Sequence, residues 1–239
     1  MTNATTEAGQ ARAARIAGAM YLIALAAAVL GEYFVRASLI VRGDPTQTAQ
    51  NIIEHERLFR IGIASDLVSF TGIVVLTLAL YVLLKPVNED LAMLAAFWWL
   101  AEAAILCVST LGNSIVLALL SGADFLKTFA PGQLHSLAGL ALSSRAAGYN
   151  IGLILFGLGS TVFSYLLLKS GYVPKALAAW GVFASLLVLM SAFWIIVFPD
   201  IPKALQLVSP AAIFIYEVAL GSWLLLKGAR IQSSSASAA

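Results

Sequence analysis

Charged residues are scarce in this sequence: 11% of its 239 residues are Asp, Glu, Lys or Arg, against roughly 25% in a typical soluble domain. Hydrophobic residues make up 61% of the chain, which is more apolar surface than a soluble core of this size could hide. The composition therefore predicts a protein whose main partner is the lipid bilayer. The formal net charge of +2 is small and dispersed, so nothing indicates a nucleic-acid partner or a polybasic site for anionic headgroups.

Residues that carry redox and haem chemistry are also scarce. The single cysteine, Cys107, excludes an intrachain disulfide and the Cys-x-x-Cys pair of a disulfide-relay quinone reductase. The two histidines, His55 and His135, lie in predicted loops, whereas a six-helix haem cytochrome needs histidine pairs inside its helices. We therefore predict no cofactor.

Hydrolase and metal motifs are missing as well. No histidine follows Gly159-Ser160, as a rhomboid-like protease would require, and no HExxH motif or Gly-rich phosphate loop occurs. A site built from Glu32, Asp66 and a loop histidine is a less favoured alternative, because a lone loop histidine is usually a surface residue. We predict no metal.

Long apolar runs dominate what is present. A helix needs about 20 apolar residues to cross a ~30 Å hydrocarbon layer, and lipid requires backbone groups to be satisfied within helices. Six stretches qualify, at about 15–40, 58–84, 91–120, 145–168, 175–198 and 207–227. The segment LHSLAGLAL (134–142) is expected to form a separate interfacial helix. The fold class predicted is an all-α polytopic membrane protein, with six transmembrane helices in a single bundle.

The chain ends complete the predicted organisation. Residues 1–14 are expected to form an N-terminal cytoplasmic tail, 15–228 the transmembrane domain, and 229–239, ending in SSSASAA, a disordered tail. Basic residues divide equally between the two sides, but on one side the loops are short and almost free of acids. This context favours both termini in the cytoplasm.

Seven polar residues interrupt the predicted spans: Glu32, Asp66, Glu102, Asn113, Arg145, Asn150 and Glu217. Counting ~1.5 Å per residue from the terminal lysines places Glu102 and Glu217 near mid-membrane, and Glu32, Asp66 and Asn150 in the outer third. An ionisable residue inside a span is costly and usually faces the bundle interior. Four acids on four helices therefore predict a polar chamber open toward the outer face.

Two interpretations of these residues stay open. In one, Arg145 bridges an acid, and the other acids are neutral and fix helix packing through hydrogen bonds. In the other, Asp66 or Glu32 is a catalytic general acid, and the partner groups Glu102, Glu217, Arg145, Asn150, Asn113 and Tyr33 form a binding site.

Several segments resemble a known family. FRIGIASDL (59–67), YVLLKPVNEDLAMLAA (81–96), FGLGSTVFSYLLLKSGYVPKALAAWG (156–181) and the Glu217 region ending in WLLLKG (223–228) are similar to the bacterial multi-pass family DUF4386, a domain of unknown function. The resemblance runs from about Arg15 to Gly228. It implies a six-helix protein of the bacterial inner membrane, but it supplies no activity and no catalytic residues.

Three functions are compatible with the sequence. The first is an outer-leaflet pocket for a small lipophilic ligand, with acid-catalysed isomerisation or cyclisation of an isoprenoid-like lipid as its enzymatic form. The second is a proton-coupled small-molecule transporter, forming a homo-oligomer, with Glu102 and Glu217 as relay carboxyl groups. The third is a structural or regulatory membrane subunit.

Overall fold

The computed structural model describes residues 3–198, 200 and 202–231. Its elements are α1 (Asn3–Val29), the π-helix η1 (Leu30–Arg36), α2 (Ala37–Leu39), α3 (Pro45–Glu54), α4 (Glu56–Leu84), α5 (Glu89–Leu119), the 3-10 turn η2 (Asp124–Leu126), α6 (Pro131–Ser170), α7 (Lys175–Val197) and α8 (Lys203–Leu226). This part of the chain contains no strand. Six of its helical segments are long and apolar enough to cross a membrane, which confirms the predicted six-span, all-α fold.

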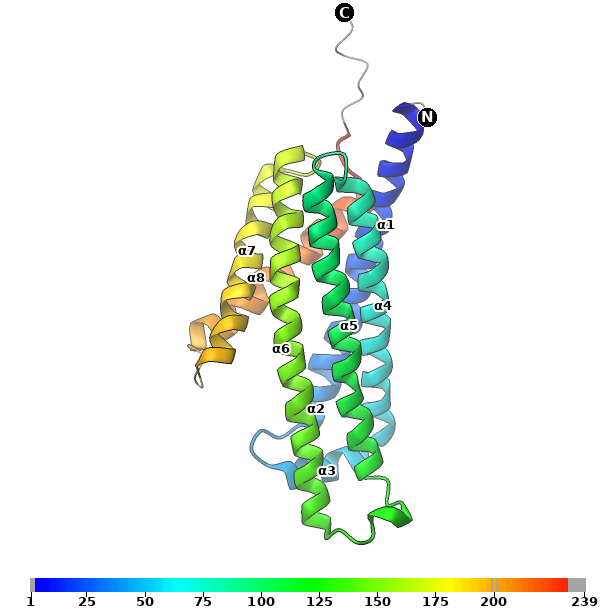
Figure 1. Cartoon of the computed structure of the whole chain (residues 1–239), viewed down its shortest axis with the longest axis vertical. Coiled ribbons are helices and arrows are strands. Elements are labelled where there is room, and N and C mark those ends of the chain that lie inside the picture. Colours follow the sequence, from blue (N-terminus) through cyan, green and yellow to red (C-terminus); the bar gives the residue numbers. More distant parts are fainter. Residues whose placement is uncertain (1–2, 199, 201, 232–239) are drawn as a thin grey trace, which may run out of the picture.

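The six long segments form a ring in chain order. Helices α1, α4, α5, α6 and α7 each pack against the next long helix, and α8 closes the ring by packing against α1. Helix α1 begins and α8 ends at the same end of the bundle (Figure 1), as an even number of crossings requires. We call this the terminal end, and the opposite end, which carries α3 and η2, the distal end.

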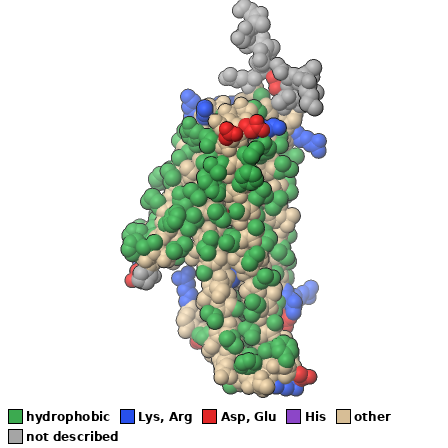
Figure 2. Space-filling model, viewed as in Figure 1, with side chains coloured by type: hydrophobic (Ala, Val, Ile, Leu, Met, Phe, Trp, Pro, Cys, Tyr) green, Lys and Arg blue, Asp and Glu red, His purple; other side chains and the backbone are tan. Residues whose placement is uncertain are grey.

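The helices differ in how far they reach toward the distal end. Helices α7 and α8 stop well short of it, whereas α4, α5 and α6 continue (Figure 1). With 40 residues, α6 is about 60 Å long at ~1.5 Å per residue, roughly twice the ~30 Å hydrocarbon thickness. On the face in Figure 2, hydrophobic side chains cover the part above the ends of α7 and α8 and also occur on the distal part, and charged side chains gather near the two ends and below the ends of α7 and α8. The distal parts of α4, α5 and α6 extend past the ends of α7 and α8.

One predicted helix is not separate. The segment 134–142 was expected as an interfacial helix, but it is the beginning of α6, so that prediction is wrong. No proline lies between this segment and the following span, and the glycines of α6 are accommodated within the helix. The segment instead packs along α3 as part of the distal extension.

The N-terminal boundary expected at residue 14 does not coincide with a structural break. Helix α1 begins at Asn3, and Gln10 is buried, donating through Nε2 to the Leu83 carbonyl and to the Tyr172 hydroxyl, both at 3.1 Å. The first helix therefore packs into the bundle before the predicted span begins. Most of the predicted C-terminal tail, residues 232–239, lies outside the described residues.

The core is densest toward the terminal end, around Trp99 of α5. Its ring stacks on Phe156 at 5.8 Å between centroids and meets Tyr21 and Phe163 edge-on, at 6.2 and 5.0 Å. Its Nε1 donates to the Phe156 carbonyl at 3.1 Å, so the buried indole is satisfied. This aromatic cluster joins α1, α5 and α6 in the terminal half of the bundle.

Close approach of α7 to α8 depends on a glycine. Gly181 lies directly against the ring of Tyr216, and a Cβ at this position would overlap that ring. Tyr216 is fully buried and its hydroxyl shares a hydrogen bond with Ser164 Oγ at 2.8 Å, so it cannot move without losing that bond. We expect Gly181→Ala to lower the free energy of unfolding by about 1–3 kcal/mol, the usual cost of overpacking a core.

Thermal unfolding of the purified protein in detergent measures this effect. Gly132→Ala is the matched control, because nothing lies within 4 Å of a Cβ there and alanine favours the helix. Equal unfolding temperatures for the two variants would show that the α7–α8 contact is not tightly packed.

Candidate functional site

Four charged side chains meet between the first span, α4 and α6. Arg36 Nη1 and Nη2 donate to the two carboxylate oxygens of Asp66, at 2.7 and 2.9 Å, and Arg36 Nε donates to Glu32 at 2.8 Å. Arg145 Nη2 donates to the same Glu32 oxygen at 3.2 Å and lies 3.9 Å from Asp66. We call Glu32, Arg36, Asp66 and Arg145 the ion cluster; its two guanidinium groups balance its two carboxylates.

The local backbone makes this cluster possible. Residues Leu30–Arg36 form a π-helix, a wider turn that often occurs at functional sites. A Cβ on Gly31 would lie 3.0 Å from Asp66 Oδ1, and one on Gly62 would lie 2.9 Å from Val35. Two glycines therefore let η1 and α4 approach closely enough for Arg36 to reach Asp66 with both terminal nitrogens.

A cavity of about 220 Å³ adjoins the ion cluster inside the ring. Glu32 lies at one end of it and Tyr21 and Trp99 at the other, and five of the six spans contribute to its wall. Most of the lining is apolar, and the aromatic members are Tyr21, Tyr33, Phe70, Trp99, Tyr149, Phe156 and Phe214. The cavity is thus an apolar chamber that ends at charged groups on its distal side.

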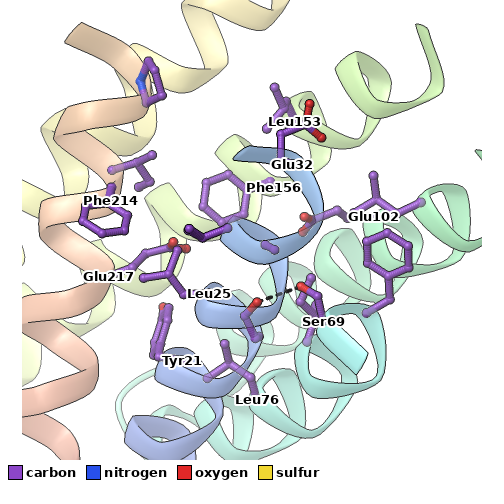
Figure 3. A pocket seen from close by; sticks show the side chains of 18 of the residues that line it. Tyr21, Leu25, Glu32, Ser69, Leu76, Glu102, Leu153, Phe156, Phe214 and Glu217 are labelled. Atoms are coloured by element: carbon purple, nitrogen blue, oxygen red, sulfur yellow. Dashed lines mark hydrogen bonds between the residues drawn. The ribbon is translucent and has the colours of Figure 1, made fainter. Parts of the chain in front are cut away.

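Two further carboxyl groups line this cavity. Glu102 of α5 and Glu217 of α8 lie on either side of it (Figure 3). Glu102 is 5% exposed, and its Oε2 has no hydrogen-bond partner among the described residues. Within the same part of the chain, Glu217 also accepts no hydrogen bond from another side chain. Among the described residues that line the chamber, Glu102 Oε2 is therefore the buried polar atom without a hydrogen-bond partner.

A wider groove leads from the cavity to the surface between η1 and α8. Its volume is about 1,050 Å³, and it shares Val29, Glu32, Tyr33, Pro210 and Phe214 with the cavity wall. Its remaining lining includes three basic residues, Arg36, Arg42 and Lys203. Lys203 is the first residue of α8, so the groove extends to the beginning of that helix.

The structure brings most of the predicted site residues together in two groups. Glu32, Asp66 and Arg145 meet in the ion cluster, and Glu102, Glu217 and Tyr33 join Glu32 around the cavity. Asp66 lines neither the cavity nor the groove, because both its oxygens face Arg36.

The two predicted asparagines belong to neither group. Asn113 is fully buried in α5, and its amide nitrogen and oxygen have no partner among the described residues. Asn150 is half-buried in α6, and neither residue lines the cavity or the groove. Asn113 lies further toward the distal end of α5 than Glu102 and Leu106, two of the residues with which that helix lines the cavity.

The residue that the sequence analysis missed is Arg36. It was counted among the basic residues flanking the first span, yet it is 4% exposed and forms the strongest contacts of the ion cluster. One signal was available, since Glu32 and Arg36 are spaced i, i+4, the separation at which an acid and a base meet on one helix face.

The ion cluster gives a direct stability prediction. Asp66→Asn is expected to lower the free energy of unfolding by about 3–5 kcal/mol, because breaking a buried pair leaves a guanidinium charge uncompensated. The double variant Arg36→Met with Asp66→Leu should recover most of that loss, since well-packed apolar residues often replace a buried pair at little cost.

Unfolding of the detergent-solubilised protein measures both variants. The control on the same helix is Glu56→Gln, which removes a pair with Arg60 whose side chains are 53% and 61% exposed, and which should cost no more than about 1 kcal/mol. An Asp66→Asn protein as stable as the control would contradict a structural role for the Arg36–Asp66 pair.

Comparison with known proteins places the chain in a family without adding a function. Neither the curated proteins nor the solved structures contain a match to it. A family model does match, that of DUF4386, a domain of unknown function, over residues 16–228. This range includes most of the first span, the other five spans, the ion cluster and the cavity. The chain is a member of the DUF4386 family.

Proposed function

We propose that this membrane protein binds a small lipophilic ligand in the cavity beside the ion cluster. The observation that carries the proposal is the buried Glu102 carboxyl group, which lines an apolar chamber with an oxygen that no described residue satisfies. Ligand sites are typically concave and mostly apolar, with a few polar groups that orient the ligand. An unsatisfied buried carboxyl group is costly to a fold, so a ligand that supplies its partner accounts for its presence.

The size of the chamber limits the ligand. Its volume of about 220 Å³ is below the ~300–1,000 Å³ of common ligand pockets. It therefore suits a small molecule, or one arm of a longer molecule whose remainder occupies the groove between η1 and α8. The residues shared by cavity and groove, among them Tyr33 and Pro210, support entry from the side rather than along the bundle axis.

Within this proposal, the ion cluster positions the wall of the site. Asp66 accepts from Arg36 with both oxygens and lies behind the cavity wall, which fits a positioning residue better than a general acid. Glu32 is different, because its side chain is 42% exposed and lines the cavity. If the protein catalyses acid chemistry on its ligand, Glu32 and Glu102 are the groups that can contact the reacting atoms.

A transporter is the second candidate, and specific observations favour it. Glu102 and Glu217 share one cavity, and α8 contains Pro210 inside its span, a feature that recurs in the broken helices of transporters. A transporter would also need a path for its substrate from the cavity to the terminal end of the bundle. There the stacked cluster around Trp99 closes the cavity, which supports a site open to one side.

We also propose that both termini face the cytoplasm of a bacterial cell, so that the groove opens toward the outer leaflet. The short connections at the terminal end carry Lys85, Lys169, Lys175 and Lys227 with few acids, as positively charged inner loops do. Fusion of a fluorescent protein to the C-terminus should give a fluorescent cell, and fusion of alkaline phosphatase should give no activity. The opposite pair of results would place the groove in the inner leaflet.

Filling the cavity tests the proposed function. Ala28 lines the cavity, and Ala28→Phe should occupy the space that a ligand would need. We expect this variant to lose any lipophilic molecule that the wild-type protein retains through purification, as detected by mass spectrometry. The structural reason is steric, since the added ring replaces ligand volume without removing a polar group.

Ala26→Phe is the matched control, because Ala26 lies two residues away on the same helix and is exposed on its outer face. It should retain the same molecule. Equal retention by both variants, with unfolding temperatures equal to wild type, would show that the cavity is not the binding site.

A further inference from the structure

We propose that the ligand of the cavity is a lipophilic amine or another small organic cation, held between Glu102 and Glu217. This inference rests on the proposed function and adds the chemical class of the ligand. It follows from the charge of the cavity, from the hydrogen-bond donors already used inside it, and from its aromatic walls.

The ionisable Asp, Glu, Lys, Arg and His side chains that line the cavity are all acidic. Among the described residues that line it, three are acidic and none is Lys, Arg or His. The nearest cations, Arg36 and Arg145, are engaged with Glu32 and Asp66 in the ion cluster. Glu102 and Glu217 therefore lack a cationic partner from the part of the chain that the structure describes, and a bound ammonium group would supply one.

Two donors of the wall are already used. Ser69 Oγ donates to the Ala24 carbonyl at 3.0 Å, and Trp99 Nε1 donates to the Phe156 carbonyl at 3.1 Å. Neither is free to satisfy Glu102 Oε2, and the hydroxyls of Tyr21, Tyr33 and Tyr149, which also line the cavity, donate no hydrogen bond to it. A ligand N–H satisfies that oxygen directly, and hydrogen bonds to a charged group are roughly twice as strong as neutral ones.

The aromatic walls suit the same ligand class. Trp99 and Phe156 cover one face of each other by stacking, and the other aromatic rings of the wall are Tyr21, Tyr33, Phe70, Tyr149 and Phe214. A cation within about 6 Å of a ring face is attracted by the ring quadrupole. The apolar part of an amine would meanwhile pack against the aliphatic residues of the wall.

An anionic amphiphile is the competing ligand class. Its headgroup could contact Arg42 and Lys203 in the groove while its chain enters the cavity. An aliphatic chain, however, would bury Glu102 and Glu217 without giving either a donor. The observations therefore favour the cation, and the anion becomes one outcome of the test.

Three probes of matched shape separate these classes: 4-phenylbutylammonium, its neutral isostere pentylbenzene and the anion 4-phenylbutanoate. Binding to the full chain in zwitterionic nanodiscs is measured by equilibrium dialysis against empty nanodiscs. We expect the ammonium to bind at least about tenfold more tightly than either other probe, the usual scale for a hydrogen bond to a charged group. This comparison uses the wild-type protein and does not depend on the folding of a variant.

Variants then locate the interaction. Glu102→Gln and Glu217→Gln should each weaken binding of the ammonium about tenfold and leave pentylbenzene unchanged, and Glu102→Asp should retain part of the preference. Asp90→Asn is the control, because Asp90 is an exposed acid on the same helix as Glu102 and lies outside the cavity.

The remaining outcomes distinguish the two proposals. If pentylbenzene or 4-phenylbutanoate binds as tightly as the ammonium, and Ala28→Phe abolishes that binding, the amine class is wrong while the cavity remains the site. If Ala28→Phe changes the binding of none of the probes, both proposals are overturned.

Discussion

The two-pronged contact between Arg36 and Asp66 is the constraint on which the distal half of the bundle depends. It ties the end of the first span to α4. A buried guanidinium is tolerated only with matched partners, and here Asp66 and Glu32 accept three hydrogen bonds from it. Beside this contact the distal half has its own apolar core, which includes Val35, Phe59 and Val116.

The same contact explains how the cavity is shaped. Arg36 holds Glu32 through its Nε, and Glu32 in turn faces the cavity and contacts Arg145 of α6. The glycines at positions 31 and 62 allow the close approach, and the π-helix accommodates the extra width. Charge pairing at the distal end and aromatic packing at the terminal end thus enclose an apolar space between them. Glu102 and Glu217 are the polar groups left inside that space.

Much of this arrangement could be predicted from the sequence, because membrane spans obey simple rules of length and polarity. Counting residues from the terminal lysines placed Glu102 and Glu217 at one depth, and the structure has them around one cavity. The depth of a residue along a helix can be counted from the sequence, because the rise per residue of an α-helix is nearly constant. The family resemblance and the six-span fold were likewise available from the residues alone and are confirmed.

What could not be predicted depends on rotation about the helix axes and on where helices stop. Asn113 and Asn150 do not line the cavity, and no periodicity in nearly uniform apolar spans reveals which polar residues do. Arg36 lies inside the predicted span 15–40, but its contact with Asp66 depends on the π-helix Leu30–Arg36, which an apolar run does not indicate. The length of α6 was missed because the segment 134–142 and the following span were treated as separate helices, whereas the helix continues through both.

The closure of the ring by its first and last helices has a consequence for biogenesis. A chain inserted from its N-terminus can pack α1, α4, α5, α6 and α7 successively, but the seam between α1 and α8 forms only when synthesis is nearly complete. Until then Glu32 and Glu102 lie in an incomplete ring, because Glu217 belongs to α8 itself. Assembly of the last span is therefore the step that completes the chamber, and the groove beside Pro210 lies along that seam.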